Sequence, residues 1–155
     1  LVFSTLHTND APSSITRLQN MGTPNYLISA ALTLIMAQRL ARKNCSECSV
    51  IDENVTPKLL NSIGFLPEQS ARAKIYKGKG CDQCGNSGYK GRMGIYEILE
   101  IDKELKQGIL SDLSQTELNS IAKKNGFKTM QEMGHDLLLS GDLSFSEYER
   151  VLQSN

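Results

Sequence analysis

The chain has 155 residues, and its 39% hydrophobic content is enough for a hydrophobic core. Aromatic residues make up only 6% of the chain, so this core should contain few aromatic side chains. Seventeen basic residues balance seventeen acidic ones, so no net field draws the chain toward nucleic acid or a membrane surface. The longest apolar run, residues 26–37, is interrupted by Ser29 and Thr33 and is shorter than the ~20 residues that cross a bilayer. We therefore expect a soluble, cytoplasmic chain of one domain or two small ones, with no direct membrane insertion and no nucleic-acid partner.

The first elements are predicted to be a strand and two helices. Residues 1–6 are apolar and β-prone, which is typical of a strand buried inside a sheet. No neighbouring strand precedes them, so we interpret the first residue as a cut through a larger domain. A helix follows, because Asn9 or Asp10 can cap it and Gly22 can end it. A second helix is expected over residues 26–40, deeply buried because apolar residues occupy nearly all its faces.

His7 and Thr8 lie between the predicted strand and the first helix. The carboxyl end of a strand leading into a helix is where α/β folds place ligand chemistry. Both residues are therefore candidates for sensing a phosphate. The alternative is that His7 only satisfies nearby backbone groups. Local sequence alone favours this alternative, because one histidine is a weak signal.

Four cysteines occur as two pairs, Cys45 with Cys48 and Cys81 with Cys84, and each pair has two residues between its sulfurs. Structural zinc takes four ligands in a tetrahedron, and two such turns supply them. Two disulfides are an alternative, but nothing indicates secretion and a reducing cytosol disfavours them. A redox Cys-x-x-Cys motif is another alternative. Such a motif usually opens a helix after a strand, and neither cysteine pair does so convincingly. The sequence therefore predicts one Zn²⁺ bound by Cys45, Cys48, Cys81 and Cys84, closing a loop of 32 residues, 49–80.

The loop between the cysteine pairs is predicted to be a small module that the metal organises. Residues 56–64 begin with Thr-Pro and end with Gly, which indicates a short helix, and residues 73–76 suit a strand. Several basic residues surround the second cysteine pair, and most of them are expected to be a solvated surface.

The C-terminal part is predicted to be a returning strand followed by helices. Residues 94–101 alternate weakly, and Asp102 can cap the helix that follows. Three further Ser/Thr-x-x-Glu capping patterns begin at Ser114, Thr129 and Ser144. We expect these helices to form a compact bundle in which His135 is a surface or packing residue and not a ligand.

Several stretches of the chain carry a resemblance to one family: residues 4–11 with 16–18 and 21–22, residues 37–40, residues 88–97 and residues 125–130. In this order they resemble the histidine box and later segments of the bacterial traffic ATPases, which drive type IV pilus assembly and type II secretion. The pilus-extension ATPases are the nearer match, and the type II secretion ATPases are a near second. The resemblance covers essentially the whole chain.

The resemblance implies an α/β plus α fold in three parts. Residues 1–43 would be the C-terminal part of a RecA-like ATPase core, and residues 44–93 the zinc-binding tetracysteine module. Residues 94–155 would be the returning strand and a helical C-terminal domain.

The resemblance also implies the site and the partners. The residue at the position of His7 faces the γ-phosphate in this family, and the counterpart of Arg92 sits near the nucleotide and the neighbouring subunit. Arg92 is therefore a candidate nucleotide-binding residue, in addition to Thr8. The full-length protein would use ATP and Mg²⁺, form a hexamer, and bind an inner-membrane platform protein from the cytoplasmic side. The family's phosphate loop, G-x-x-x-x-G-K-[ST], and its acidic boxes do not occur in these 155 residues, so the chain alone should be inactive.

One function of another class is also considered. A stand-alone zinc-ribbon module could hold nucleic acid or an acidic protein through the basic residues near the second cysteine pair. The balanced charge and the lack of interleaved aromatic and basic residues count against it.

Overall fold

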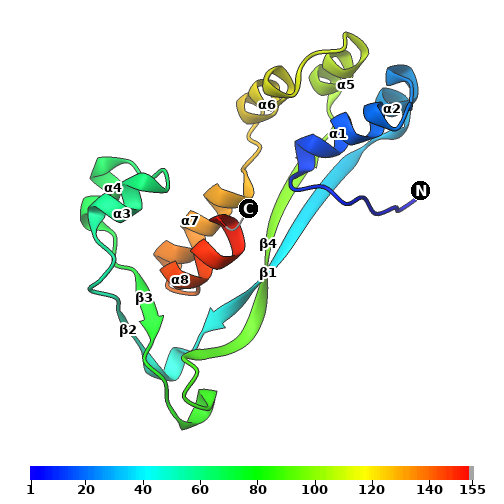
Figure 1. Cartoon of the computed structure of the whole chain (residues 1–155). Coiled ribbons are helices and arrows are strands. Elements are labelled where there is room, and N and C mark those ends of the chain that lie inside the picture. The colour runs from blue at the N-terminus through cyan, green and yellow to red at the C-terminus, as the bar shows by residue number, and fades with distance from the viewer. Residues whose placement is uncertain (154–155) are drawn as a thin grey trace. The chain divides into compact units, whose positions relative to one another are not determined.

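The computed structural model describes residues 1–153, which divide into two compact units (Figure 1). The first unit comprises Leu1–Gln38 and Tyr96–Met130, and the second comprises Arg39–Ile95 and the residues from Gln131 onward. The two longest strands, β1 (Leu34–Asn44) and β4 (Tyr89–Glu100), are paired in a two-stranded sheet, and each contributes residues to both units. The mixed α/β character predicted from the sequence is confirmed.

The first unit is built on four helices and one shared core. The helices are α1 (Ala11–Asn20), α2 (Asn25–Ala31), α5 (Lys103–Leu110) and α6 (Gln115–Lys124). Helix α2 packs on α5, and α1 packs on α6. The core is wholly aliphatic, and its buried members are Ala11, Ile15, Ile28, Leu99, Ile101, Leu105, Ile109, Leu118 and Ala122.

Local side-chain chemistry explains where these helices begin. The Asp10 carboxylate accepts the backbone N–H of Ser13 at 2.7 Å, and Asp102 accepts that of Leu105 at 2.8 Å. Ser114 forms the predicted reciprocal capping box with Glu117 at the start of α6. Each cap satisfies donors that a first helical turn leaves without a partner.

The second unit combines short strands, short helices and the C-terminal helices. In chain order its remaining elements are η1 (Ser46–Cys48), β2 (Ser49–Ile51), α3 (Pro57–Ser62), α4 (Pro67–Arg72), β3 (Tyr76–Gly78), η2 (Asp82–Cys84), α7 (Met130–Ser140), α8 (Phe145–Tyr148) and η3 (Glu149–Gln153). Strands β2 and β3 are antiparallel, with Ser49 opposite Gly78 and Ile51 opposite Tyr76. The two strands therefore run directly between the cysteine pairs.

His135 packs as the sequence predicted. Its Nε2 lies 2.9 Å from the carbonyl oxygen of Ile63 and 3.1 Å from the hydroxyl of Tyr148. The ring also contacts the rings of Phe65 and Tyr148. Burial lowers the pKa of His135, so the ring is neutral at pH 7 and serves as a hydrogen-bonded packing group.

The predicted strand over residues 1–6 is wrong. These residues form no strand, and Leu1, Val2 and Phe3 are almost fully exposed. A strand exists only through hydrogen bonds to a partner, and no strand within residues 1–153 pairs with this segment. An apolar, β-prone composition is therefore not sufficient here.

The predicted helix over residues 26–40 is also wrong in its length and its burial. Helix α2 ends at Ala31, and from Leu34 the chain continues as β1. Along β1 the exposed Leu34 and Met36 alternate with the half-buried Ile35 and Ala37, which is the period of two that a strand gives. An apolar run cannot by itself distinguish a helix from a strand.

Smaller differences concern the insert and the C-terminal helices. The short helix predicted over residues 56–64 is present as α3, but α4 and β2 were missed. The strand predicted over residues 73–76 begins only at Tyr76. The helices expected to form one bundle are divided, with α5 and α6 in the first unit and α8 in the second. No helix within residues 1–153 has the length and apolar character needed to span a bilayer.

Candidate functional site

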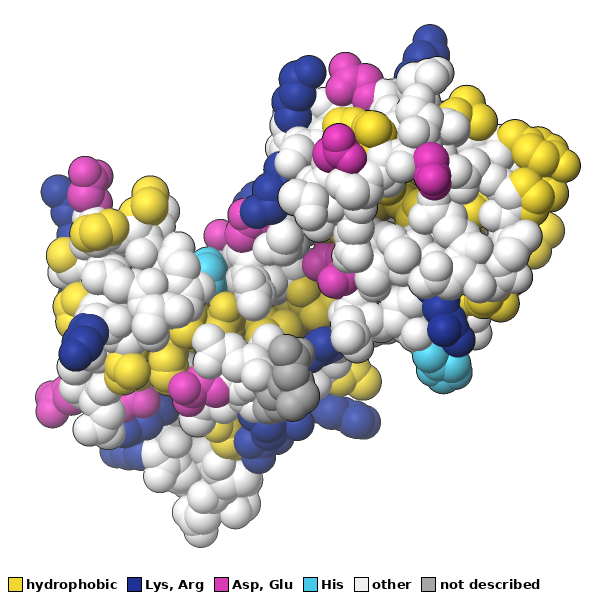
Figure 2. All heavy atoms as spheres, turned by 45° about the horizontal axis from the view of Figure 1, so that its top comes forward, with side chains coloured by type: hydrophobic (Ala, Val, Ile, Leu, Met, Phe, Trp, Pro, Cys, Tyr) yellow, Lys and Arg dark blue, Asp and Glu magenta, His cyan; other side chains and the backbone are white. Residues whose placement is uncertain are grey.

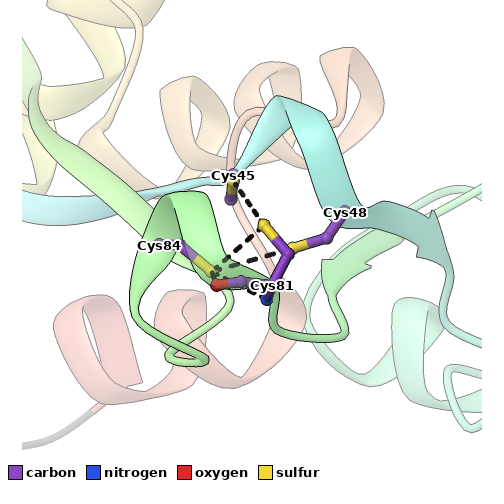
Figure 3. A group of neighbouring side chains, drawn as sticks. All are labelled: Cys45, Cys48, Cys81 and Cys84. Atoms are coloured by element: carbon purple, nitrogen blue, oxygen red, sulfur yellow. Dashed lines mark hydrogen bonds between the residues drawn. The ribbon is translucent and has the colours of Figure 1, made fainter.

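Four cysteine side chains converge in the second unit, as the sequence predicted (Figure 3). Cys45 follows the end of β1 and Cys48 ends η1, while Cys81 precedes η2 and Cys84 ends it. The Sγ atoms of Cys45 and Cys81 lie 3.9 Å apart, as do those of Cys48 and Cys84, and the Sγ atoms of Cys81 and Cys84 lie 3.7 Å apart. All four Sγ atoms lie within 4.8 Å of one another.

These separations match a tetrahedral zinc site. A Zn–S bond of about 2.3 Å places the sulfurs of a tetrahedron about 3.8 Å apart. A disulfide needs about 2.05 Å, and the four cysteines are free thiols here. The donor set, four sulfurs in two short turns, is one that selects Zn²⁺ or an iron–sulfur centre over hard cations.

A tight crossing of backbone segments fixes the two turns against each other. A Cβ atom on Gly78 would lie 1.9 Å from the carbonyl oxygen of Gly88, and one on Gly88 would lie 2.4 Å from the carbonyl oxygen of Gly78. The Gly88 carbonyl accepts the N–H of Cys45 at 2.9 Å, and Lys79 donates its N–H to the Cys48 carbonyl at 3.0 Å. Only glycine at both crossing positions allows this approach.

Backbone donors prepare one sulfur for a metal. The N–H groups of Cys81 and Gly88 point at the Cys84 Sγ at 3.2 and 3.3 Å. Burial raises the pKa of the Cys84 thiol, but these donors outweigh it and lower the pKa to about 6. Burial raises the pKa of Cys48 to about 11, and a bound metal cation would displace the proton of this thiol.

Asn44 anchors the first turn to the loop after α7. Its backbone N–H donates to the carbonyl of Asp142 at 2.8 Å, and its side-chain Nδ2 donates to the carbonyls of Tyr76 and Gly141 at 3.1 and 2.9 Å. Asn44 is 5% exposed, so these bonds form out of water, where their loss is expensive. The first cysteine turn is therefore tied to β3 and to the C-terminal helices of its own unit.

A buried carboxylate joins β1 to the last helical turns. Glu147 is fully buried, and its oxygens accept from the Arg42 backbone N–H at 2.7 Å, from the Arg42 guanidinium at 2.7 and 3.0 Å, and from Arg150 Nε at 2.8 Å. Burial alone would raise the pKa of Glu147, but the two arginines lower it to about 2. The Arg42 guanidinium also lies 4.1 Å above the ring of Tyr89.

A second buried carboxylate lies in the first unit. Glu97 on β4 is 3% exposed, and its Oε1 accepts the N–H of Ala11 at 2.7 Å. Its Oε2 accepts the N–H of Met130 at 2.8 Å. Ala11 and Met130 are the first residues of α1 and α7, so one carboxylate serves two helix N-termini.

The residues predicted to sense a nucleotide are exposed or half-buried. His7 is exposed, and Thr8 is half-buried with its hydroxyl 2.8 Å from that of Ser14. His7 and Thr8 line one shallow polar cavity of about 290 Å³ in the first unit, which is largely open to solvent. Arg92 is exposed on β4 in the part of the chain that belongs to the second unit, and it does not line that cavity.

Sequence reasoning missed both buried carboxylates and the role of Asn44. Each of these residues acts through partners that are far away in the sequence. Glu97 and Ala11 are separated by 86 residues, and Glu147 and Arg42 by 105 residues. The one available signal for Glu97 was its position on the inward-facing side of β4, between the buried Ile95 and Leu99.

The profile of the family described as "Type II/IV secretion system protein" matches residues 1–150. The chain belongs to this family. A type IV pilus assembly ATPase, PilB, of Thermus thermophilus is 42% identical over 147 residues, covering 95% of this chain and 16% of the relative. A type IV pilus assembly ATPase, TfpB, of Acinetobacter baylyi is 43% identical over 156 residues, covering 98% of this chain and 26% of the relative. Type II secretion system protein E of Aeromonas hydrophila is 33% identical over 158 residues, covering 100% of this chain and 30% of the relative.

This chain of the type II/IV secretion system family therefore spans less than a third of each of these three relatives. The resemblance stated from the sequence motifs is confirmed at the level of the family.

Proposed function

We propose that the chain is the C-terminal part of a hexameric motor ATPase that powers type IV pilin polymerisation. Its similarity to type IV pilus assembly ATPases along nearly its whole length carries this proposal. In the full-length protein, water would attack the terminal phosphorus of ATP and ADP would leave, with Mg²⁺ neutralising the phosphate charge. Residues 1–43 would complete a RecA-like core, residues 44–93 would form the metal module, and residues 94–155 would form the returning strand and helical domain.

Within this proposal, His7 stabilises the charge that develops on the γ-phosphate, and Thr8 and Arg92 contact the nucleotide. The exposed position of His7 and its place in a polar cavity support this role. The phosphate loop and the acidic boxes do not occur in the 155 residues, so the chain alone should neither bind ATP tightly nor hydrolyse it.

The test uses the full-length protein with His7→Ala. A group that acts mainly in the transition state lowers kcat much more than it weakens ATP binding, by roughly 100-fold for one well-placed donor. Lys58→Ala, an exposed change on α3, is the matched control and should leave both constants unchanged. Equal losses in kcat and in ATP affinity would contradict the transition-state role of His7.

A type II secretion ATPase is the second candidate, because a type II secretion protein matches the chain over its whole length. Either motor would bind a platform protein at the cytoplasmic face of the inner membrane. Complementation of the corresponding deletion strain separates the two. Restored surface pili with unchanged protein export would support the pilus motor, and the reverse result would support the secretion motor.

We infer that the four cysteines hold one structural Zn²⁺. The sulfur–sulfur distances and the free thiols support this. Structural zinc supplies ~10–16 kcal/mol of apparent free energy in small peptides, enough to organise the loop between the cysteine pairs. Bound zinc would link the two cysteine turns and so hold β2 and β3 between them.

Metal analysis of the freshly reduced chain should find one equivalent of zinc. Cys45→Ser should lose it, and the insert should become sensitive to protease, whereas Ser46→Ala at the exposed neighbouring position should retain it. Protein that contains no zinc would overturn the site and leave the family assignment intact.

A further inference from the structure

The polar cavity beside His7 is lined by polar side chains and one arginine. Its walls are the loop before α1, the outward face of α1 and the first residue of α6, Gln115. On α1 the cavity residues are Ser13, Thr16, Arg17 and Asn20, which follow the i, i+3, i+4, i+7 spacing of one helix face. The opposite face of α1 carries the buried core residues, so the helix separates a dry side from a polar side.

Arg17 is the only side chain in this lining with a permanent charge, and no carboxylate lines the cavity with it. The acidic residue nearest in sequence, Asp10, is committed to the N-cap of α1 through the Ser13 N–H at 2.7 Å. The remaining lining groups are hydroxyls, amides and the imidazole of His7. A cavity that offers hydrogen-bond donors and a positive charge without a carboxylate is suited to an oxyanion.

The Arg17 guanidinium is also unused. Within residues 1–153 it makes no hydrogen bond and no ion pair, and the same holds for the His7 ring. This contrasts with Arg42 and Arg150, whose guanidinium groups are both bound to Glu147. Figure 2 shows an exposed histidine with a basic side chain beside it on the surface. A planar guanidinium with free donors can bind a phosphate through two parallel hydrogen bonds.

We propose that Arg17 binds the same oxyanion as His7, and that this oxyanion is the terminal phosphate of a nucleoside triphosphate. The inference rests on the proposed motor function and adds a second phosphate-binding group to it. The hydroxyls of Ser13 and Thr16 flank Arg17 on the same helix face and offer further donors.

The experiment measures the affinities of the full-length protein for ATP and for ADP. Arg17→Gln should weaken ATP binding by about 10-fold, the lower end for a hydrogen bond to a charged group, and should change ADP binding by less than about 2-fold. Arg17→Lys keeps the charge but not the planar guanidinium, so its ATP affinity should lie between those of the wild type and Arg17→Gln. Arg72→Gln is the matched control, because Arg72 is likewise exposed and unpaired within the described residues.

The outcomes separate this inference from the function on which it rests. Wild-type protein that does not bind ATP overturns the motor function and the inference with it. Wild-type protein that binds ATP, with an Arg17→Gln affinity equal to that of Arg72→Gln, overturns only the role of Arg17. An equal loss for ATP and ADP also overturns it, since the lost contact would not be to the terminal phosphate. Thermal unfolding should be the same for all three variants, because Arg17 ties no element together.

Discussion

Replacing Glu97 with glutamine should loosen the N-termini of two helices at once. The buried Glu97 carboxylate accepts the N–H of Ala11 at 2.7 Å through one oxygen and that of Met130 at 2.8 Å through the other. The first N–H groups of a helix have no acceptor within the helix, so nothing else in the two helices can replace these bonds. A glutamine keeps one acceptor oxygen and turns an amide donor toward the other N–H.

The expected loss of stability follows from the two hydrogen bonds that the Glu97 carboxylate accepts. Hydrogen bonds to charged groups contribute about 1.5–3 kcal/mol each, and a buried donor left unsatisfied costs a similar amount. The loss of one charged bond, with the second reduced to a neutral one, should destabilise the first unit by about 2–3 kcal/mol. The loss of negative charge at two helix N-termini acts in the same direction.

Amide hydrogen exchange measures this effect at the two positions concerned. In Glu97→Gln the amides of Ala11 and Met130 should exchange at least about 10-fold faster, since about 1.4 kcal/mol corresponds to a factor of ten. Glu100→Gln is the control, because Glu100 lies on the exposed side of the same strand. The reasoning is refuted if both variants exchange alike, or if the Ala11 amide is as slow in Glu97→Gln as in the wild type.

Two further predictions concern the second unit. Glu147 has a folded-state pKa of about 2 against an ordinary value of 4.5, so its stabilisation is complete above pH 4.5 and is lost as the pH falls toward 2. The difference in unfolding free energy between wild type and Glu147→Gln should therefore narrow by about 2 kcal/mol from pH 6 to pH 3 in urea titrations, and a constant difference would refute the ion-pair origin. Gly88→Ala should weaken zinc binding and lower the thermal midpoint more than Gly91→Ala. Both glycines have φ near +80°, but only a Cβ at Gly88 meets the backbone of Gly78, so equal effects would contradict the crossing.

The convergence of the four cysteines could be predicted from the sequence because the chemistry of such a site is local. Two sulfurs separated by two residues specify a turn, and the ligand type specifies the class of metal, whatever surrounds them. The same is true of helix starts. Asp102 and Ser114 were predicted as caps because the acceptor and the N–H it binds lie three residues apart.

The failed predictions depended on partners far away in the chain. Residues 1–6 have the composition of a strand, but a strand requires another strand to pair with. The stretch from Leu34 onward is a strand because β4 lies beside β1, and the apolar pattern alone did not reveal that. His7 was a candidate because of its place between a predicted strand and a helix, and the family resemblance favoured its phosphate-sensing role. Arg17 emerged only when the cavity lining was known.

Buried polar ties supplement the hydrophobic core of this fold. The first unit's buried core is wholly aliphatic, and aromatic residues make up only 6% of the chain. Glu97 links β4 to α1 and α7, Glu147 links β1 to the final helical turns, and the cysteines link two turns that lie 36 residues apart. Removing one partner of such a tie leaves the other buried and unsatisfied, which costs more than the intact tie contributes. Single substitutions at these few positions should therefore destabilise this fold about as much as truncating a buried Leu or Ile of the core, by about 2–5 kcal/mol.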